Sequence, residues 1–257
     1  MKNISFIFIL LFCSFLMGSA YAQDVEENVT ISTDNNNQQN FTDNDLSLTI
    51  TDSATLTRTG QHGIHIKSFN NATVTVNPGS TVTSTSHNTI QGKSQSGLTV
   101  TNSGTINAGG SKAINLLDAQ NSTITNNAGG IIKSKTNTIT VTETSGKTAN
   151  NVTINNSGEI YAYETSPAAD SAAIKSEDDT DNITIINNSG GYIHSNNGNS
   201  TVTQGSTVFI SSVSNATLTN SGTIENKAGT DAYVLGVAGS GVTVTLRDKG
   251  KVIGKIN

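Results

Sequence analysis

The chain has 257 residues, a formal net charge of −5 at pH 7 and only 13% charged residues. A mildly acidic chain without basic clusters is a poor candidate for nucleic-acid binding. The absence of tryptophan, together with 5% aromatic residues, argues against a broad platform for stacking sugars. The low charge and the many Val, Ile and Thr residues favour strands over disorder.

Residues 1–22 have the pattern of a secretory signal peptide. Lys2 gives a positive start, residues 4–17 are almost continuously apolar, and a small-x-small cleavage site ends at Ala22. Because the apolar run is shorter than the ~20 residues of a membrane-spanning helix, we expect an exported mature chain without a transmembrane segment. Cleavage would also remove Cys13, the only cysteine, so we expect neither a disulfide nor a thiolate metal site.

Residues 23–44 are polar and are predicted to form an N-terminal segment or cap, in which residues 29–31 could make a short strand. From residue 45 to residue 257 the chain repeats one unit. Each unit has a turn rich in Asn and Gly between two short strands that alternate Thr with aliphatic residues, and a third strand opens it. The glycines of these turns follow at 25 to 32 residues: Gly79, Gly104, Gly129, Gly158, Gly190, Gly222 and Gly250.

The predicted strands fall into three sets. Those that open a unit are 63–66, 88–91, 112–116, 137–141, 172–176, 207–211 and 232–236. Those before the turn are 72–76, 98–101, 122–125, 152–155, 183–186, 216–219 and 242–246. Those after the turn are 80–84, 105–108, 131–134, 159–162, 192–195, 223–226 and 251–254. A weaker unit precedes them at 46–50 and 54–56.

Three short strands per unit are typical of one coil of a β-solenoid, whereas a propeller blade needs four strands in ~40–45 residues. Alternation places aliphatic side chains inside and polar ones outside, and a coil buries its inner side only when another coil stacks on it. We predict an all-β, right-handed parallel β-helix of about seven to eight coils. Val100 and Ile106 should point inward, and Asn102 should form a corner and one rung of an amide ladder between coils.

The signal peptide, the Asn-Ser-Gly-x-Ile corner and the TVTN-type strands resemble the passenger domains of bacterial autotransporters. The resemblance covers residues 45–257 and implies a β-helical adhesin or virulence factor on the outer-membrane surface of a Gram-negative bacterium. It also implies a C-terminal β-barrel carrier, yet the coil pattern continues through residues 251–257. We therefore expect a truncated passenger, one part of a split gene or a product exported by another route, and periplasmic location if no translocator is available.

The last predicted coil has no polar cap after Ile253. Unpaired strands at an open solenoid end can pair with another chain. End-to-end self-association of the chain is therefore expected.

Histidines and acids with potential chemistry are few. His62 and His65 are three residues apart and would project to opposite faces of a strand, while His87 and His194 lie in other units. We interpret all four histidines as exposed polar residues. One acidic segment contains Glu177, Asp178, Asp179 and Asp181. We interpret it as a solvated loop, with a weak calcium site as the alternative.

A carbohydrate-active β-helix enzyme would need acids grouped on one outer face, often with a cation. Arg58 and Arg247 lie near opposite ends of the chain, and Glu159 and Glu225 belong to units that are not adjacent. We therefore predict no enzyme and no catalytic, cofactor-binding or metal-binding residue. A polysaccharide lyase or hydrolase remains the alternative.

Two outward patterns bear on binding. Thr-x-Thr pairs before the turns resemble ice-binding solenoids, but Asn155 and Ile186 break the array, and Thr suits strands in any case. Tyr161 and Tyr163 share a face and could anchor a partner, although isolated surface tyrosines are usual. The sequence thus favours an exported, non-enzymatic, adhesin-like β-helix that contacts a host-surface protein or glycan.

Overall fold

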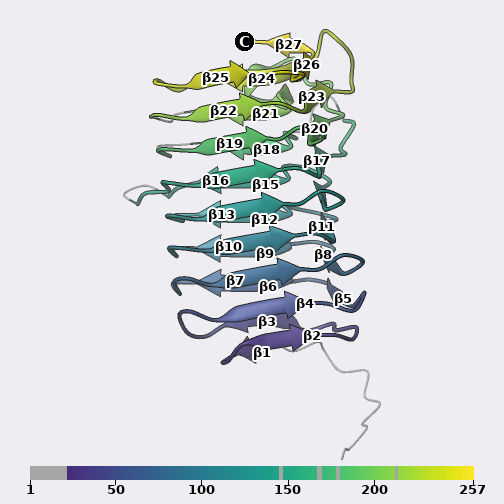
Figure 1. Cartoon of the computed structure of the whole chain (residues 1–257), viewed down its shortest axis with the longest axis vertical. Coiled ribbons are helices and arrows are strands. Elements are labelled where there is room, and N and C mark those ends of the chain that lie inside the picture. The colour runs from purple at the N-terminus through teal and green to yellow at the C-terminus, as the bar shows by residue number, and fades with distance from the viewer. Residues whose placement is uncertain (1–21, 145–146, 167–169, 178–179, 212–213) are drawn as a thin grey trace, which may run out of the picture.

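The computed structural model describes residues 22–257 except 145–146, 167–169, 178–179 and 212–213. The strands wind in successive coils from β1 at one end of a rod to β27 at the other (Figure 1). They form three parallel sheets of ten, nine and eight strands, a parallel β-helix of about eight to nine coils. The predicted fold class is confirmed, with about one coil more than expected.

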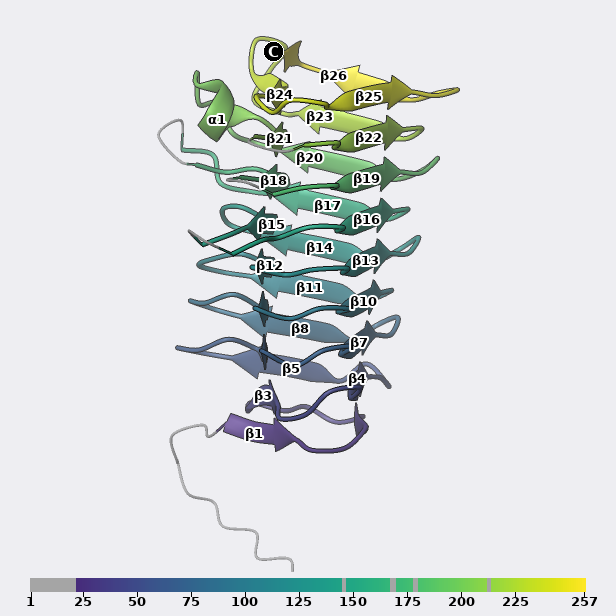
Figure 2. The same ribbon diagram turned by 90° about the vertical axis from the view of Figure 1, so that its left-hand side faces the viewer.

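Each complete coil contributes one strand to each sheet, so neighbours in a sheet come from successive coils (Figure 2). Sheet A contains β1 (Ala22–Val25), β3 (Gln38–Phe41), β6 (Ile64–Lys67), β9 (Ile90–Lys93), β12 (Ile114–Leu117), β15 (Ile139–Thr142), β18 (Ile174–Ser176), β21 (Val208–Ile210), β24 (Tyr233–Val237) and β27 (Lys255–Ile256). Sheet B contains β2 (Val29–Ile31), β4 (Ser47–Ile50), β7 (Thr73–Val76), β10 (Thr99–Asn102), β13 (Thr123–Asn126), β16 (Thr153–Asn156), β19 (Thr184–Asn187), β22 (Thr217–Asn220) and β25 (Thr243–Leu246). Sheet C contains β5 (Thr55–Arg58), β8 (Thr81–Ser84), β11 (Thr105–Ala108), β14 (Ile131–Ser134), β17 (Glu159–Ala162), β20 (Tyr192–Ser195), β23 (Thr223–Asn226) and β26 (Lys251–Ile253).

One short helical segment is present among the described residues. It is α1 (Val202–Gly205), which packs against β24 near the C-terminal end of the rod (Figure 2). Within the described part of the chain, no helix is long and apolar enough to cross a membrane.

The polar segment before residue 45 contains strands. Residues 22–44 hold β1, β2 and β3, which pair in parallel with β3, β4 and β6, so the stack begins earlier than the repeat in the sequence. Amide side chains from different turns of the segment bond to each other here. Gln39 and Asn35 both donate to Oε1 of Gln23, at 3.3 and 3.2 Å. Such bonds let Gln and Asn occupy strand positions that aliphatic residues hold elsewhere.

The interior of the rod follows the predicted alternation. Val100 and Ile106 are completely buried, whereas Thr99 and Thr101 on the same coil are partly exposed. Their counterparts stack directly above and below in parallel register, for example Val100 between Val74 and Ile124. The buried aliphatic residues of successive coils, from Val25 to Leu235, thus form one continuous core, which no single coil could bury alone.

A ladder of asparagines stabilises the corner between sheets B and C. Each rung donates from Nδ2 to Oδ1 of the next rung at 2.8 or 2.9 Å, and every rung is completely buried. The predicted amide ladder is therefore present. Its rungs are Asn102, Asn126, Asn156, Asn187 and Asn220.

The ladder corrects the predicted register of one turn. Asn187, and not Asn188, is the rung, and Gly191, and not Gly190, accepts the backbone bond from the following coil. This turn has four residues between its strands, two more than the turn that follows Asn156, and one of the four is Gly190, whose φ of 86° only glycine adopts easily. The two additional residues move the Asn-Ser-Gly pattern by one residue along the chain, while the strands stay in register.

Candidate functional site

The outer face of sheet C changes character along the rod. Its strands are in register, so their outward side chains form two columns along the rod axis. In β5, β8 and β11 these columns hold only Thr and Asn. From β14 to β23 one column reads Lys133, Tyr161, His194 and Glu225, and the other reads Ile131, Glu159, Tyr192 and Thr223.

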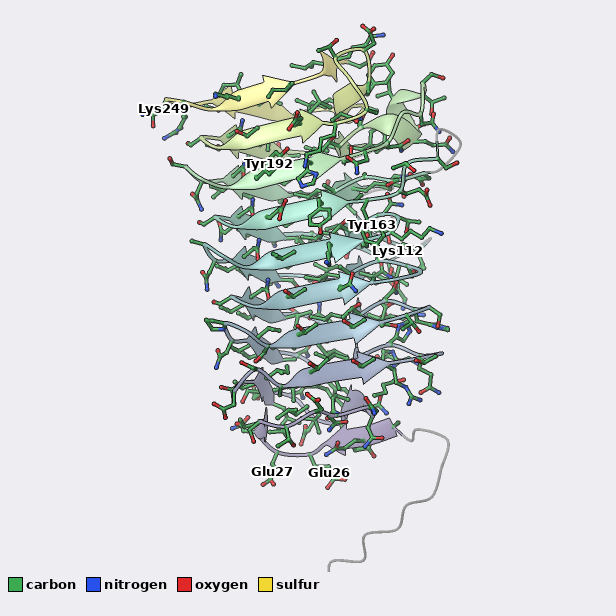
Figure 3. All side chains as sticks on the ribbon, turned by 90° about the vertical axis from the view of Figure 1, so that its right-hand side faces the viewer. Glu26, Glu27, Lys112, Tyr163, Tyr192 and Lys249 are labelled. Carbon is green, nitrogen blue, oxygen red and sulfur yellow. The ribbon has the colours of Figure 1, made fainter. Side chains whose placement is uncertain are left out.

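These side chains form one contiguous cluster. Figure 3 looks onto this face and shows Tyr163 and Tyr192 on it. Tyr163 follows β17, and its ring centroid lies 6.3 Å from that of Tyr161. The predicted shared face of these two tyrosines is therefore confirmed. We call the cluster the aromatic patch, and its members are Lys133, Glu159, Tyr161, Tyr163, Tyr192, His194, Glu225 and Lys227.

His194 lies at the centre of the aromatic patch. Its ring stacks on Tyr161 with centroids 4.7 Å apart and planes at 8°, and Tyr192 lies 4.4 Å away at 32°. Nε2 of His194 bonds Oε1 of Glu159 at 2.8 Å. The side chain is only 4% exposed, so the prediction of an exposed histidine is wrong here. Adjacent strands are ~4.8 Å apart, so Tyr161 on the preceding coil covers one face of the ring, and Tyr192 on the same strand lies beside it.

Charged groups complete the aromatic patch at its edges. The hydroxyl of Tyr192 donates to Oε2 of Glu225. Nζ of Lys227 lies 4.9 Å from the centroid of the Tyr192 ring, and Nζ of Lys133 lies 6.0 Å from that of Tyr161. Both lysines are within the range of cation–π attraction. The ring faces thus contact each other or a lysine, while ring edges and charged groups face solvent.

Burial determines the protonation of this cluster. Desolvation lowers the pKa of His194 even though Glu159 favours the charged form, so the ring is neutral at pH 7. In that form Nε2–H donates to Glu159, and the buried Nδ1 has no hydrogen-bond partner among the described residues. Burial and the bond to Glu225 raise the pKa of Tyr192, so its hydroxyl remains a donor.

The two outward acids of sheet C are separate, as predicted. Glu159 and Glu225 belong to β17 and β23, and β20 lies between those strands. Each carboxylate already has a partner within the aromatic patch: Glu159 bonds His194, and Glu225 bonds Tyr192. The arrangement is that of two separate hydrogen-bonded acids and not of a facing catalytic pair.

Three of the histidines form a second cluster that the sequence did not indicate. His62 precedes β6, so the alternation of a strand does not direct its side chain, and the expected opposite placement of His62 and His65 is wrong. Their ring centroids are 5.2 Å apart, and His87 lies 5.5 Å from His62. Burial, followed by the neighbouring His65, lowers the pKa of His62 to about 4. Among the described residues, no group of three or more His, Cys, Asp or Glu could hold a metal ion.

The acidic loop is only partly described, because Asp178 and Asp179 lie outside the described residues. Glu177 pairs with Nζ of Lys175 at 2.6 Å, and that lysine is almost completely buried. Asp181 accepts a hydrogen bond from the backbone of Ser214 at 3.2 Å. Calcium binding by this loop stays a prediction.

A polar cavity of about 320 Å³ lies beside the loops that follow β9 and β12. Its buried carboxylate is that of Asp118, which accepts bonds from the backbone and hydroxyl of Thr144 at 2.6 and 2.9 Å. Lys147 is 3.6 Å from the same carboxylate. Burial alone would raise the pKa of Asp118, but the bonds from Thr144 and the charge of Lys147 lower it overall. The carboxylate is thus ionised and already paired within the protein.

The chain matches no family model, no curated protein and no solved structure.

Proposed function

We propose that this chain is an exported, non-enzymatic β-helix that acts as an adhesin-like binding protein, with the aromatic patch as its contact surface. The observation that carries the proposal is the change along sheet C. Thr and Asn are sufficient for outward positions in β5, β8 and β11. Stacking of the coils therefore does not require tyrosine, histidine and charged residues at the same positions of β17 and β20.

The chemistry of the aromatic patch favours a protein partner over a glycan. Sugar rings stack on free aromatic faces, but the faces of Tyr161 and Tyr192 already contact His194 or a lysine. Ring edges and paired charges remain outward, while the hydroxyls of Tyr163 and Tyr192 bond Ala108 and Glu225. Tyrosine and charged residues of this kind are typical of the centre and rim of protein interfaces.

The proposed location follows from the leader and from the resemblance to autotransporter passengers. We place the chain outside the inner membrane, on the surface of a Gram-negative bacterium or released from it, with the periplasm as the location if no translocator is available. Fractionation of cells that express the full chain, followed by mass spectrometry, should find a product that begins near Gln23. A product that keeps Lys2 and stays in the cytoplasm would contradict export.

Binding of the purified exported chain to cultured epithelial cells tests the contact surface. In the test variant, Tyr161→Thr, Tyr163→Thr and Tyr192→Thr place on the patch the residue that β8 uses. The matched control, Thr81→Ala and Thr83→Ala, changes the same columns on β8. We expect the tyrosine variant to bind about tenfold more weakly and the control to bind like the unaltered chain.

Equal binding by both variants, with circular dichroism that shows both folded, would refute the aromatic patch as the contact surface. Protease treatment of the cells should abolish binding, whereas loss of binding after glycosidase treatment would favour a glycan. Turnover of acidic polysaccharides that Asp178→Asn and Asp179→Asn abolish would overturn the non-enzymatic role in favour of a carbohydrate-active enzyme.

One observation favours ice binding as a second candidate function. On the outer face of sheet B, one column is an uninterrupted series of threonines, and the breaks at Asn155 and Ile186 fall in the other column alone. Thermal hysteresis by the purified chain would support this function, and its absence at high protein concentration would exclude it. The threonines are Thr73, Thr99, Thr123, Thr153, Thr184, Thr217 and Thr243.

A further inference from the structure

The two ends of the rod expose different surfaces. In the last coil, Val244, Leu246, Ile253 and Ile256 are 39–57% exposed, and they are the exposed large apolar side chains of the described residues. In the first coils the corresponding apolar residues are buried: Val25 is 0% and Phe41 is 3% exposed. The C-terminal coil thus has an apolar surface that the N-terminal coil lacks.

The ends also carry opposite charge. Residues 22–57 contain seven acidic residues and no lysine or arginine. Residues 242–257 contain four basic residues and one acid. Glu26 and Glu27 lie at one end of the rod and Lys249 lies at the other (Figure 3). Since these side chains are exposed, opposite ends of two copies would attract each other, while like ends would repel.

The backbone at the two ends is complementary as well. The last strands of the three sheets are β27, β25 and β26, and the first strands of sheets A and B are β1 and β2. Every pairing between these strands and their neighbours is parallel. A terminal strand presents unpaired N–H and C=O groups. A second copy in the same orientation could therefore continue sheets A and B in the direction that the sheets already have.

We propose that copies of this chain associate head to tail, with the acidic N-terminal coil of one copy resting on the apolar, basic C-terminal coil of another. The second copy covers Leu246 and Ile256 and places Glu26 and Glu27 near Lys249 and Lys251. Such a contact joins two different surfaces, so it leaves each copy with one free end and continues into a filament.

Head-to-tail association would align the aromatic patches of successive copies along one fibre. Weak contacts repeated in this way bind a multivalent surface more tightly than one contact does. The association itself does not depend on the adhesin-like role and is tested without any partner.

Two charge-reversed variants test the proposed contact. The first carries Lys249→Glu and Lys251→Glu, and the second carries Glu26→Lys and Glu27→Lys, so that within each variant the side chains at positions 26, 27, 249 and 251 all have charges of the same sign. Sedimentation velocity of the unaltered exported chain should show assemblies that grow with concentration and shrink with added salt. Each variant alone should sediment as a monomer, and an equimolar mixture of the two should assemble again.

Single cysteines then distinguish head-to-tail contact from like-end contact, since the only native cysteine, Cys13, lies in the leader. Chains with Glu27→Cys and chains with Lys249→Cys should form disulfide-linked pairs when mixed under mild oxidation and few such pairs when kept apart. Circular dichroism of each variant checks that it is folded. A monomeric unaltered chain at every concentration, a mixture of the charge variants that stays monomeric, or efficient pairing of one cysteine variant with itself would overturn the proposal.

Discussion

Two columns of side chains run along this rod: one repeats the same residue from coil to coil, and the other does not. The inner column is the asparagine ladder, which repeats one residue from Asn102 to Asn220 and is completely buried. The outer column of sheet C changes from Thr83 through Tyr161 to Glu225. Inside, each amide bonds backbone groups of its corner, and between rungs it bonds the identical amide of the next coil. Outside, water or a neighbouring side chain can satisfy many types of residue. A residue that repeats from coil to coil is therefore one that the stacking of the coils requires. Outward residues that differ between coils are not required for stacking.

The end of the ladder supports this view. Below Asn102 the register position is occupied by Val76, and Oδ1 of Asn102 has no hydrogen-bond partner among the described residues. An interior rung such as Asn156 both donates and accepts, because Nδ2 bonds Asn187 and Oδ1 accepts from Asn126, each at 2.9 Å. Rungs of the same residue type thus differ in the number of bonds that they make.

The largest effect is expected from removing an interior rung. Asn156→Ala would remove one of the bonds of Asn126 and the partner of both Asn187 Oδ1 and the Gly158 N–H. We expect it to lower the free energy of unfolding by about 2–4 kcal/mol. Guanidinium denaturation followed by circular dichroism measures the change. Asn102→Ala is the control at the end of the ladder, and it should cost about half as much, because it also removes an unpaired acceptor. Equal costs at the two positions would mean that the amides do not act as a ladder.

The second largest effect is expected on the pH dependence of stability, to which histidines of the outer surface contribute and the asparagines of the ladder do not. Burial lowers the pKa of both His194 and His62, the latter to about 4, so the unfolded chain takes up these protons more readily. Stability is therefore full above pH ~6.5 and falls below it, by up to ~1.4 kcal/mol per pH unit for each histidine. Denaturation between pH 8 and pH 5 should show this fall.

The variants His62→Gln and His194→Gln should each make that fall shallower. His87→Gln, at an exposed histidine of the same cluster as His62, serves as the control. A fall of unchanged slope in both test variants would show that other groups cause the pH dependence.

Much of the fold could be predicted from the sequence because its signals are local. Alternation within four or five residues and a glycine at each corner place the strands from 46 to 254 within one or two residues of their observed positions. Local signals fail where a contact connects coils. The turn that contains Gly190 looks regular along the chain, and only the stacking of Asn187 on Asn156 shows the true register.

The aromatic patch was missed for the same reason. His194 and Tyr161 are distant in sequence, and the loops between them differ in length from coil to coil, so each residue taken alone looks like an ordinary polar or surface residue. The available signal was the alignment of strands 159–162, 192–195 and 223–226, in which Tyr161, His194 and Glu225 occupy the same position. Comparison of one position across successive coils would have revealed the cluster, though not the burial of its central ring.

The smallest effect is expected at a second asparagine corner, which lies on the surface. Asn151 is exposed and has a φ of 53°, and its Nδ2 bonds Asn121 at 3.0 Å. Here asparagine is useful for its tolerance of positive φ, and water can replace its side-chain bond. Asn151→Gly should therefore change stability by less than ~0.5 kcal/mol, and Asn151→Ala should cost about 1 kcal/mol. At the buried Asn156 the side-chain hydrogen bonds matter more than the backbone conformation. Substitution by glycine or by alanine removes the amide, so both should lower stability strongly. If Asn151→Gly proved as costly as Asn156→Gly, the exposed corner would also depend on side-chain bonds between coils, and burial would not be what separates the two asparagine columns.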